Sequence, residues 1–129
     1  MNRTNRAVYS VASLIGLSFA LLCQSVAAMP PEERVKVKQL IAYVEGLQNV
    51  QFVRNGKRYP AAEAGQFMRL KCESKLNDLK RAQDAIAACF TRSDTSGEPY
   101  QMRFSDASLK PSAVVLIEAL KQIEATAKR

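Results

Sequence analysis

The chain has 129 residues, with 19 Lys and Arg against 12 Asp and Glu, and it contains neither histidine nor tryptophan. The lack of histidine excludes Ser-His-Asp and Cys-His catalysis and removes the commonest metal ligand. The five glycines are scattered singly and form no phosphate-binding loop, so we expect neither a metal nor a cofactor.

The first 28 residues have the layout of a secretory signal peptide. Two arginines form its basic head, the apolar core covers residues 11–23, and Val26-Ala27-Ala28 offers the small residues of a cleavage site. The core is 13 residues long, whereas a membrane-spanning helix needs about 20. We predict cleavage after Ala28, a single soluble domain over residues 29–129, and no stable membrane insertion of the product.

Two alternatives to cleavage stay open. The segment could remain as a membrane anchor, or Cys23 could carry a lipid, although Leu22 is larger than lipid attachment requires. Cleavage would remove two of the 19 basic residues and no acidic residue, so the net charge would fall from +7 to +5. This balance allows attraction to anionic lipid headgroups, cell-wall polymers or acidic proteins, but a solvated basic surface needs no partner. Nucleic acid is not an expected partner, because no aromatic-basic stacking motif is present.

The predicted mature chain begins with a helix and a β-hairpin. Pro30-Pro31 and the two glutamates after them are typical of a first helical turn, and apolar residues then repeat at three and four. We expect this helix over residues 32–47. A segment rich in β-formers, residues 50–54, leads into Asn55-Gly56, the strongest short hairpin signal, and residues 57–59 return as the second strand.

Three further helices and one more strand follow. The patterns predict helices over residues 60–77 and 82–90, a strand over residues 100–104, and a last helix capped by Ser112. A loop rich in Ser, Gly and Pro precedes the strand. This order predicts an α+β fold, with about four helices packed on a small antiparallel sheet of about three strands.

Cys72 and Cys89 would remain after cleavage, placed symmetrically about the expected turn between the second and third helices. If these helices are antiparallel, the two cysteines face each other, and an oxidising compartment would favour a disulfide bond. Two buried thiols are the alternative. Redox chemistry is less expected, because the Cys-x-x-Cys spacing is absent.

Two surface segments are candidate binding sites. The first is the basic hairpin with the helix after it, whose cations are Arg54, Lys57, Arg58, Arg69, Lys71 and Lys75. An anionic ligand would suit this set, and a charged edge that resists aggregation is the alternative. The second is Ser96-Gly97-Glu98-Pro99-Tyr100, which is either a protruding recognition loop or ordinary loop architecture.

An enzyme would have to rely on carboxylates, because histidine is missing. Four of them could meet in space as general acid and base, although nothing in their spacing requires it: Glu63, Asp84, Asp94 and Glu98. Acidic side chains are also common on solvated surfaces and in the first turn of helices, and this explains these residues equally well. A carboxylate-dependent hydrolase is therefore only an alternative.

Two motifs stand in order along the chain. The first is Phe52-Val53-Arg54-Asn55-Gly56, followed by Tyr59, Ala61, Glu63-Ala64, Arg69 and Lys71. The second is Ser93-Asp94-Thr95-Ser96-Gly97-Glu98-Pro99-Tyr100. Together they resemble the signatures of the YfeK-like family of small exported bacterial proteins, a domain of unknown function, over about residues 35–125. The resemblance implies a periplasmic location and leaves the activity open.

The chain departs from that family at three positions. Many members have a histidine where this chain has Phe67, so any chemistry of that histidine would be absent here. Members have apolar residues at positions 72 and 89, which fits contact between the two cysteines. A weaker likeness links Ser96-Gly97-x-x-Tyr100 to a motif of some periplasmic lysozyme inhibitors, although those proteins are β-rich and a lysozyme is itself basic.

The predicted function is that of a non-catalytic periplasmic domain that binds an envelope protein or an anionic ligand. Lysozyme inhibition through the second loop is an alternative, as is the hydrolase. The residues predicted to bind are Arg54, Asn55, Lys57, Arg58, Arg69, Ser96, Gly97 and Tyr100.

Overall fold

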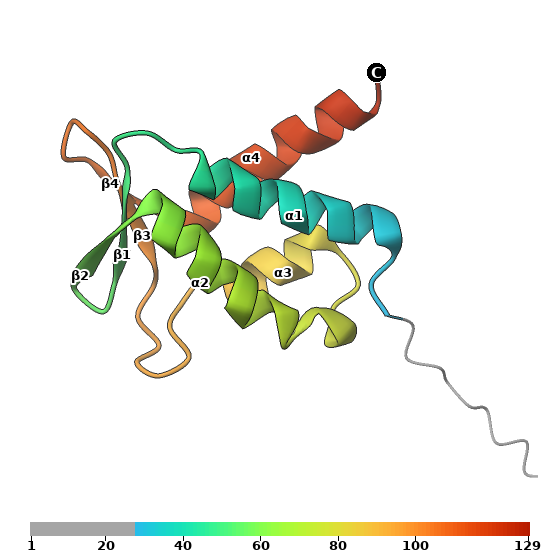
Figure 1. The fold of residues 1–129 in the computed structure, drawn as a ribbon, viewed down its shortest axis with the longest axis horizontal. Helices are drawn as coiled ribbons and strands as arrows, with labels where there is room; N and C mark the ends of the chain where they lie inside the picture. The colour runs from blue at the N-terminus through green and yellow to red at the C-terminus, as the bar shows by residue number, and fades with distance from the viewer. Residues whose placement is uncertain (1–27) are drawn as a thin grey trace, which may run out of the picture.

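A computed structural model describes residues 28–129, and Figure 1 shows how their elements are arranged. The helices are α1 (Pro31–Glu45), α2 (Ala61–Glu73), α3 (Ala82–Cys89) and α4 (Ser112–Ala127), with a 3₁₀ turn at Leu76–Asp78. The strands are β1 (Gln51–Arg54), β2 (Lys57–Pro60), β3 (Gln101–Arg103) and β4 (Leu109–Pro111). They form one antiparallel sheet in the order β2-β1-β3-β4, so the predicted α+β class is confirmed. Apart from Ala28, the predicted signal peptide lies outside the described residues.

Helix α1 is held in place by one apolar stripe. Pro31 begins the helix and two glutamates follow in the first turn, where acidic side chains suit the helix dipole. The stripe is buried, and its members are Val37, Leu40, Ile41 and Val44. It packs against the other three helices, so α1 lies at the centre of the helical layer, with α2 running beside it in the opposite direction (Figure 1).

Strands β1 and β2 form the predicted hairpin. Asn55 and Gly56 make its turn with φ values of 50° and 74°, the left-handed conformation that this turn requires. Phe52 pairs with Tyr59 on β2 and with Met102 on β3. Phe52 and Met102 are buried, so this face of the sheet is turned toward the helices, and the sheet closes one end of the helical layer (Figure 1).

The fold differs from the predictions in three places. Strand β4 is a fourth strand that the sequence did not indicate, because its three residues are exposed and show no apolar alternation. The prediction that Ser112 caps the last helix is wrong: Ser112 is the first residue of α4, is buried, and donates its hydroxyl hydrogen to the carbonyl of Phe90. Helix α2 ends at Glu73, and Leu70, expected on its apolar side, is exposed.

One hydrophobic core joins the helices and the sheet. Its largest buried side chains include Tyr100, Phe90, Met68 and Leu116, which come from four different segments of the chain. Within residues 28–129, no helix has both the length and the apolar character that crossing a membrane requires.

Candidate ligand-binding site

The turn of the hairpin is tied to the loop that precedes β3. Asn55 donates from Nδ2 to Ser93 Oγ at 3.4 Å, and its Oδ1 accepts from Ser96 Oγ at 2.5 Å. Inside the loop, Ser93 is buried, and Gly97 turns the chain with φ at 74°. The two sequence motifs, about 40 residues apart in the chain, therefore meet at Asn55.

Tyr100 is buried, with 1% of its surface exposed. Its ring packs 5.0 Å from the ring of Phe52 and meets the ring of Phe67 edge-on at 6.1 Å. Its hydroxyl accepts a hydrogen bond from Lys71 Nζ at 3.0 Å. A recognition loop that enters a cleft needs this tyrosine to protrude, so the loop offers Ser96 at the surface but not Tyr100.

Lys71 and Lys75 both form ion pairs with Asp94. The carboxylate oxygens of Asp94 lie 3.2 Å from Lys71 Nζ and 3.1 Å from Lys75 Nζ. Hydrogen bonds from Lys75 and Lys71 lower the pKa of Asp94 below its usual value. Lys71 also donates to the carbonyl of Arg92 at 2.7 Å. The two lysines therefore anchor the loop to the C-terminal end of α2 and the residues just after it, and do not form an open basic surface.

The other predicted cations do not gather into one patch either. Arg69 pairs with Glu45 of α1 at 2.8 Å. Arg58 lies opposite Val53 in the register of the hairpin. Both side chains are therefore on the face of the hairpin that is turned away from α2. Arg54 and Lys57 are directly opposite each other and lie on the face toward α2. These last two are the cations that the fold leaves at a common site.

A pocket of about 130 Å³ lies between the hairpin and the first turns of α2. Its lining residues are Phe52, Arg54 and Tyr59 from the hairpin and Glu63, Ala64 and Phe67 from α2. Three of them are aromatic, one is basic and one is acidic. Because an apolar cavity of about 150 Å³ accommodates benzene, this pocket has room for roughly one six-membered ring.

Arg54 is the basic residue of the pocket, and one of its hydrogen-bond donors has no acceptor among the described residues. Its guanidinium carbon lies 4.3 Å from the ring centroid of Phe67, in cation–π contact. Its Nε is buried and has no hydrogen-bond partner among residues 28–129. A buried donor without a partner costs about 1–3 kcal/mol, and more where the group is charged. Arg54 therefore lines the pocket and carries a buried Nε–H that no group of the described residues accepts.

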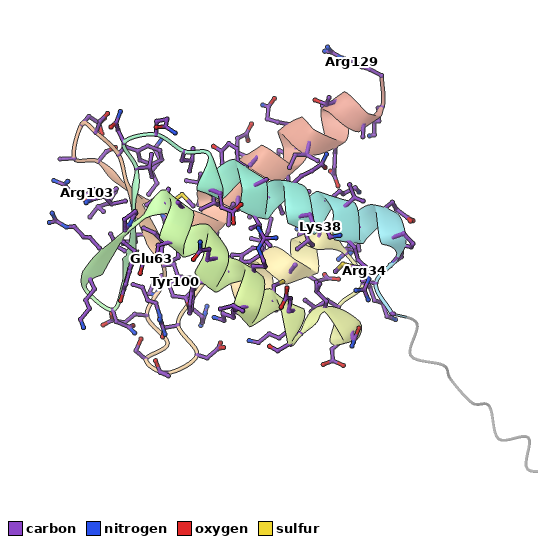
Figure 2. The ribbon with its side chains drawn as sticks, in the orientation of Figure 1. Arg34, Lys38, Glu63, Tyr100, Arg103 and Arg129 are labelled. Atoms are coloured by element: carbon purple, nitrogen blue, oxygen red, sulfur yellow. The ribbon has the colours of Figure 1, made fainter. Side chains whose placement is uncertain are left out.

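Glu63 brings a negative charge to the same pocket. It stands in the first turn of α2, is exposed, and has neither an ion pair nor a hydrogen bond through its side chain within the described part of the chain. Figure 2 shows Glu63 and Tyr100 at the sheet end of α2, whereas Arg34 and Lys38 lie toward the opposite end of the helical layer. Arg54 and Glu63 thus line one pocket without pairing with each other.

The two cysteines face each other across α2 and α3, as predicted. Cys72 and Cys89 are buried, and their sulfurs lie 2.6 Å apart. Their hydrogen bond lowers the pKa of Cys89 and raises the pKa of Cys72, which burial raises further. The structure has two free thiols here, so the disulfide bond stays a prediction.

The four carboxylates considered for catalysis lie in different places. Asp94 pairs with Lys71 of α2 and with Lys75 just after it, Asp84 accepts the backbone N–H of Arg81 at 2.9 Å, and Glu98 is exposed in the loop. Only Glu63 lines the pocket. Over the same described range, no three Cys, Asp or Glu side chains gather as a metal site would need.

The aromatic residues of the pocket were not predicted as site residues. Alternation along the two strands puts Phe52, Arg54, Lys57 and Tyr59 on one face of the hairpin, and this could have been inferred from the sequence. The approach of Phe67 could not, because it depends on how α2 packs against that face.

A protein-family model described as a family of unknown function (DUF5329) matches residues 31–124. The match begins with α1 and ends inside α4, so it covers the sheet and the pocket. No curated protein and no solved structure matches the chain.

Proposed function

The chain belongs to this family of unknown function, and we propose that it is a non-catalytic binding domain for a small ligand that carries an anionic group. The proposed site is the pocket between the hairpin and α2. The observation that carries the proposal is the Nε of Arg54, a buried donor that has no hydrogen-bond partner among residues 28–129.

An anionic group is the partner that Arg54 fits best. The Nε and one Nη of a guanidinium form a fork that matches the two oxygens of a carboxylate or phosphate. Lys57, exposed and directly opposite Arg54, adds a second positive charge on the same face of the hairpin. The aromatic side chains that line the pocket lower the local polarity beside Arg54, which would strengthen its attraction for an anion.

Binding without catalysis is supported by the composition of the pocket. Hydrolysis of glycosides by carboxylates uses a pair, one as acid and one as base or nucleophile, and among residues 28–129 Glu63 is the single carboxylate that lines this pocket. Lysozyme inhibition is less well supported, because Tyr100 is buried beneath the loop that would have to enter the enzyme.

The test is a titration followed by backbone amide NMR shifts, with four probes: acetate, inorganic phosphate, 3-phenylpropanoate and L-phenylalanine. We expect at least one probe to shift amides of β1, β2 and the start of α2. Arg54→Met keeps the apolar contact with Phe67 and removes the donor, so it should weaken binding about tenfold or more.

Two further variants complete the test. Arg54→Lys keeps the charge but loses the fork, and should also bind weakly. Lys80→Met removes one positive charge from an exposed position outside the pocket, and should bind like the natural protein. The proposal fails if no probe shifts these amides, or if Arg54→Met and Lys80→Met bind equally well.

We further propose that the domain works in the periplasm, as the signal-like N-terminus and the resemblance to the YfeK-like family suggest. In that oxidising compartment, Cys72 and Cys89 would form a disulfide bond between α2 and α3. Their buried position and the contact of their sulfurs support this proposal.

A further inference from the structure

The pocket carries both a positive and a negative residue, which is not the arrangement expected for a simple anion. Glu63 lines the same small space as Arg54, and the two side chains form no ion pair. A ligand with only an anionic group would gain from Arg54 and be repelled by Glu63 at short range. A ligand with both charges would use both residues.

We propose that the ligand is a zwitterion, namely an α-amino acid with an apolar side chain of about one ring in size. This inference rests on the proposed function and names the ligand class for the same pocket. The carboxylate of the amino acid binds the fork of Arg54, and its ammonium group binds Glu63. The side chain lies among Phe52, Tyr59 and Phe67.

The size and lining of the pocket favour an apolar side chain. The volume of about 130 Å³ suits a single ring or a branched aliphatic group, and the aromatic walls offer it no hydrogen-bonding groups apart from the hydroxyl of Tyr59. Glycine and serine would leave the apolar walls in contact with water. They should therefore bind more weakly than phenylalanine or leucine.

Tyr100 acts here as a positioning residue. It lies behind the pocket, with its ring against Phe52 and Phe67 and its hydroxyl fixed by Lys71. Two of the three aromatic walls are thus held in place before any ligand arrives. Such preorganisation lowers the entropy cost of binding. It gives the contact between Tyr100 and the pocket walls a role that does not require Tyr100 to be exposed.

Isothermal titration of the natural protein with matched probes tests the inference. L-Phenylalanine has both charges and the ring, 3-phenylpropanoate lacks the ammonium group, phenethylamine lacks the carboxylate, and glycine lacks the ring. We expect phenylalanine to bind about tenfold or more tightly than each of the other three, because each of them leaves one part of the pocket unpaired.

Glu63→Gln then isolates the ammonium contact. In this variant, phenylalanine should lose about tenfold in affinity, while 3-phenylpropanoate should bind as well as before or better, because the repulsion is gone. The matched control is Glu32→Gln, an exposed glutamate in the first turn of α1 at the other end of the helical layer, which should leave both affinities unchanged.

The outcomes separate the two proposals. If 3-phenylpropanoate binds as tightly as phenylalanine and both depend on Arg54, the zwitterion inference is overturned and the proposed function stands. If Glu63→Gln weakens both probes alike, the ammonium contact is likewise refuted. If no carboxylate binds in an Arg54-dependent manner, the proposed function itself fails and the inference falls with it.

Discussion

Gly65 allows α1 and α2 to approach each other closely. It is buried in the middle of α2, and a Cβ atom placed there would meet the side chain of Glu45 from α1. Glu45 crosses Gly65 to reach Arg69, with which it forms an ion pair. Glycine inside a helix costs about 1 kcal/mol relative to alanine, and the crossing of Glu45 explains why it is present here.

Gly65→Ala should therefore destabilise the protein despite the better helix propensity of alanine. Overpacking costs about 1–3 kcal/mol and the propensity gain is about 1, so we expect a net loss of roughly 1 kcal/mol in the free energy of unfolding. Urea denaturation measures it. In a Glu45→Ala background the clash is removed, and the same substitution should be neutral or stabilising; equal effects in both backgrounds would refute the explanation.

At the scale of elements, Glu33 joins two helices. It stands in the first turn of α1, and its Oε2 accepts the backbone N–H of Ala82, the first residue of α3, at 2.7 Å. The N-terminal amides of a helix have no partners inside it, so a side chain from another helix serves here as their acceptor. Hydrogen bonds from Lys36 and from this amide lower the pKa of Glu33.

Glu33→Gln tests this connection through its pH dependence. Because the pKa of Glu33 is lowered by folding, its charge stabilises the native state fully above the unfolded-state pKa of about 4.3, and this contribution is lost as the pH falls through the lower folded-state value. We expect the variant to be less stable by about 1 kcal/mol at pH 7 and nearly equal to the natural protein near pH 2. Urea denaturation at both pH values measures the difference.

The neighbouring Glu32 supplies the control for this experiment. It is exposed in the same turn and makes no contact with α3 through a hydrogen bond or ion pair among the described residues, so Glu32→Gln should show a smaller difference at pH 7. A Glu33→Gln effect that persists unchanged at low pH would mean that the charge is not what stabilises the contact.

Elements with strong local signals were predictable, and those defined by their neighbours were not. The hairpin follows from Asn55-Gly56, whose backbone conformation few other residue pairs adopt. Strand β4 has no such signal, since Leu109–Pro111 is exposed and becomes a strand only by pairing with β3. The residue type of Ser112 suits a helix cap, but tertiary packing buries it and its hydroxyl bonds to the carbonyl of Phe90 instead.

The same division applies to the site. Arg54 was named from the sequence because a run of basic residues surrounds the turn, but that run also contained Arg69 and Lys71, whose acidic partners come from α1 and the distant loop. Which cation stays without a partner depends on the whole arrangement of helices. The pocket itself is a product of how α2 crosses the hairpin, and no local pattern encodes that crossing.

For the molecule as a whole, the residue that follows the predicted cleavage point is part of the packed fold. Met29, the residue after the predicted cut, is buried in the core, and its carbonyl accepts a hydrogen bond from Arg34 Nε at 3.1 Å. The N-terminus of a processed chain would thus be packed against α1. Cleavage one or two residues later would remove Met29 and these contacts. A cut there should therefore leave the domain less stable.

The final prediction combines processing with the cysteine pair. If cleavage follows Ala28 and Cys72 bonds to Cys89, as we propose, the intact mass of the protein recovered from the periplasm should equal that of residues 29–129 less two hydrogens. Their separation of 17 residues gives the bridge a stabilising effect of about 3 kcal/mol through the unfolded chain. Urea denaturation with and without reductant should show that difference, and a Cys72→Ala, Cys89→Ala variant should not respond to reductant. Alkylation of both thiols in unfolded, unreduced protein would instead establish two buried thiols, whose contact stabilises α2 against α3 by packing alone.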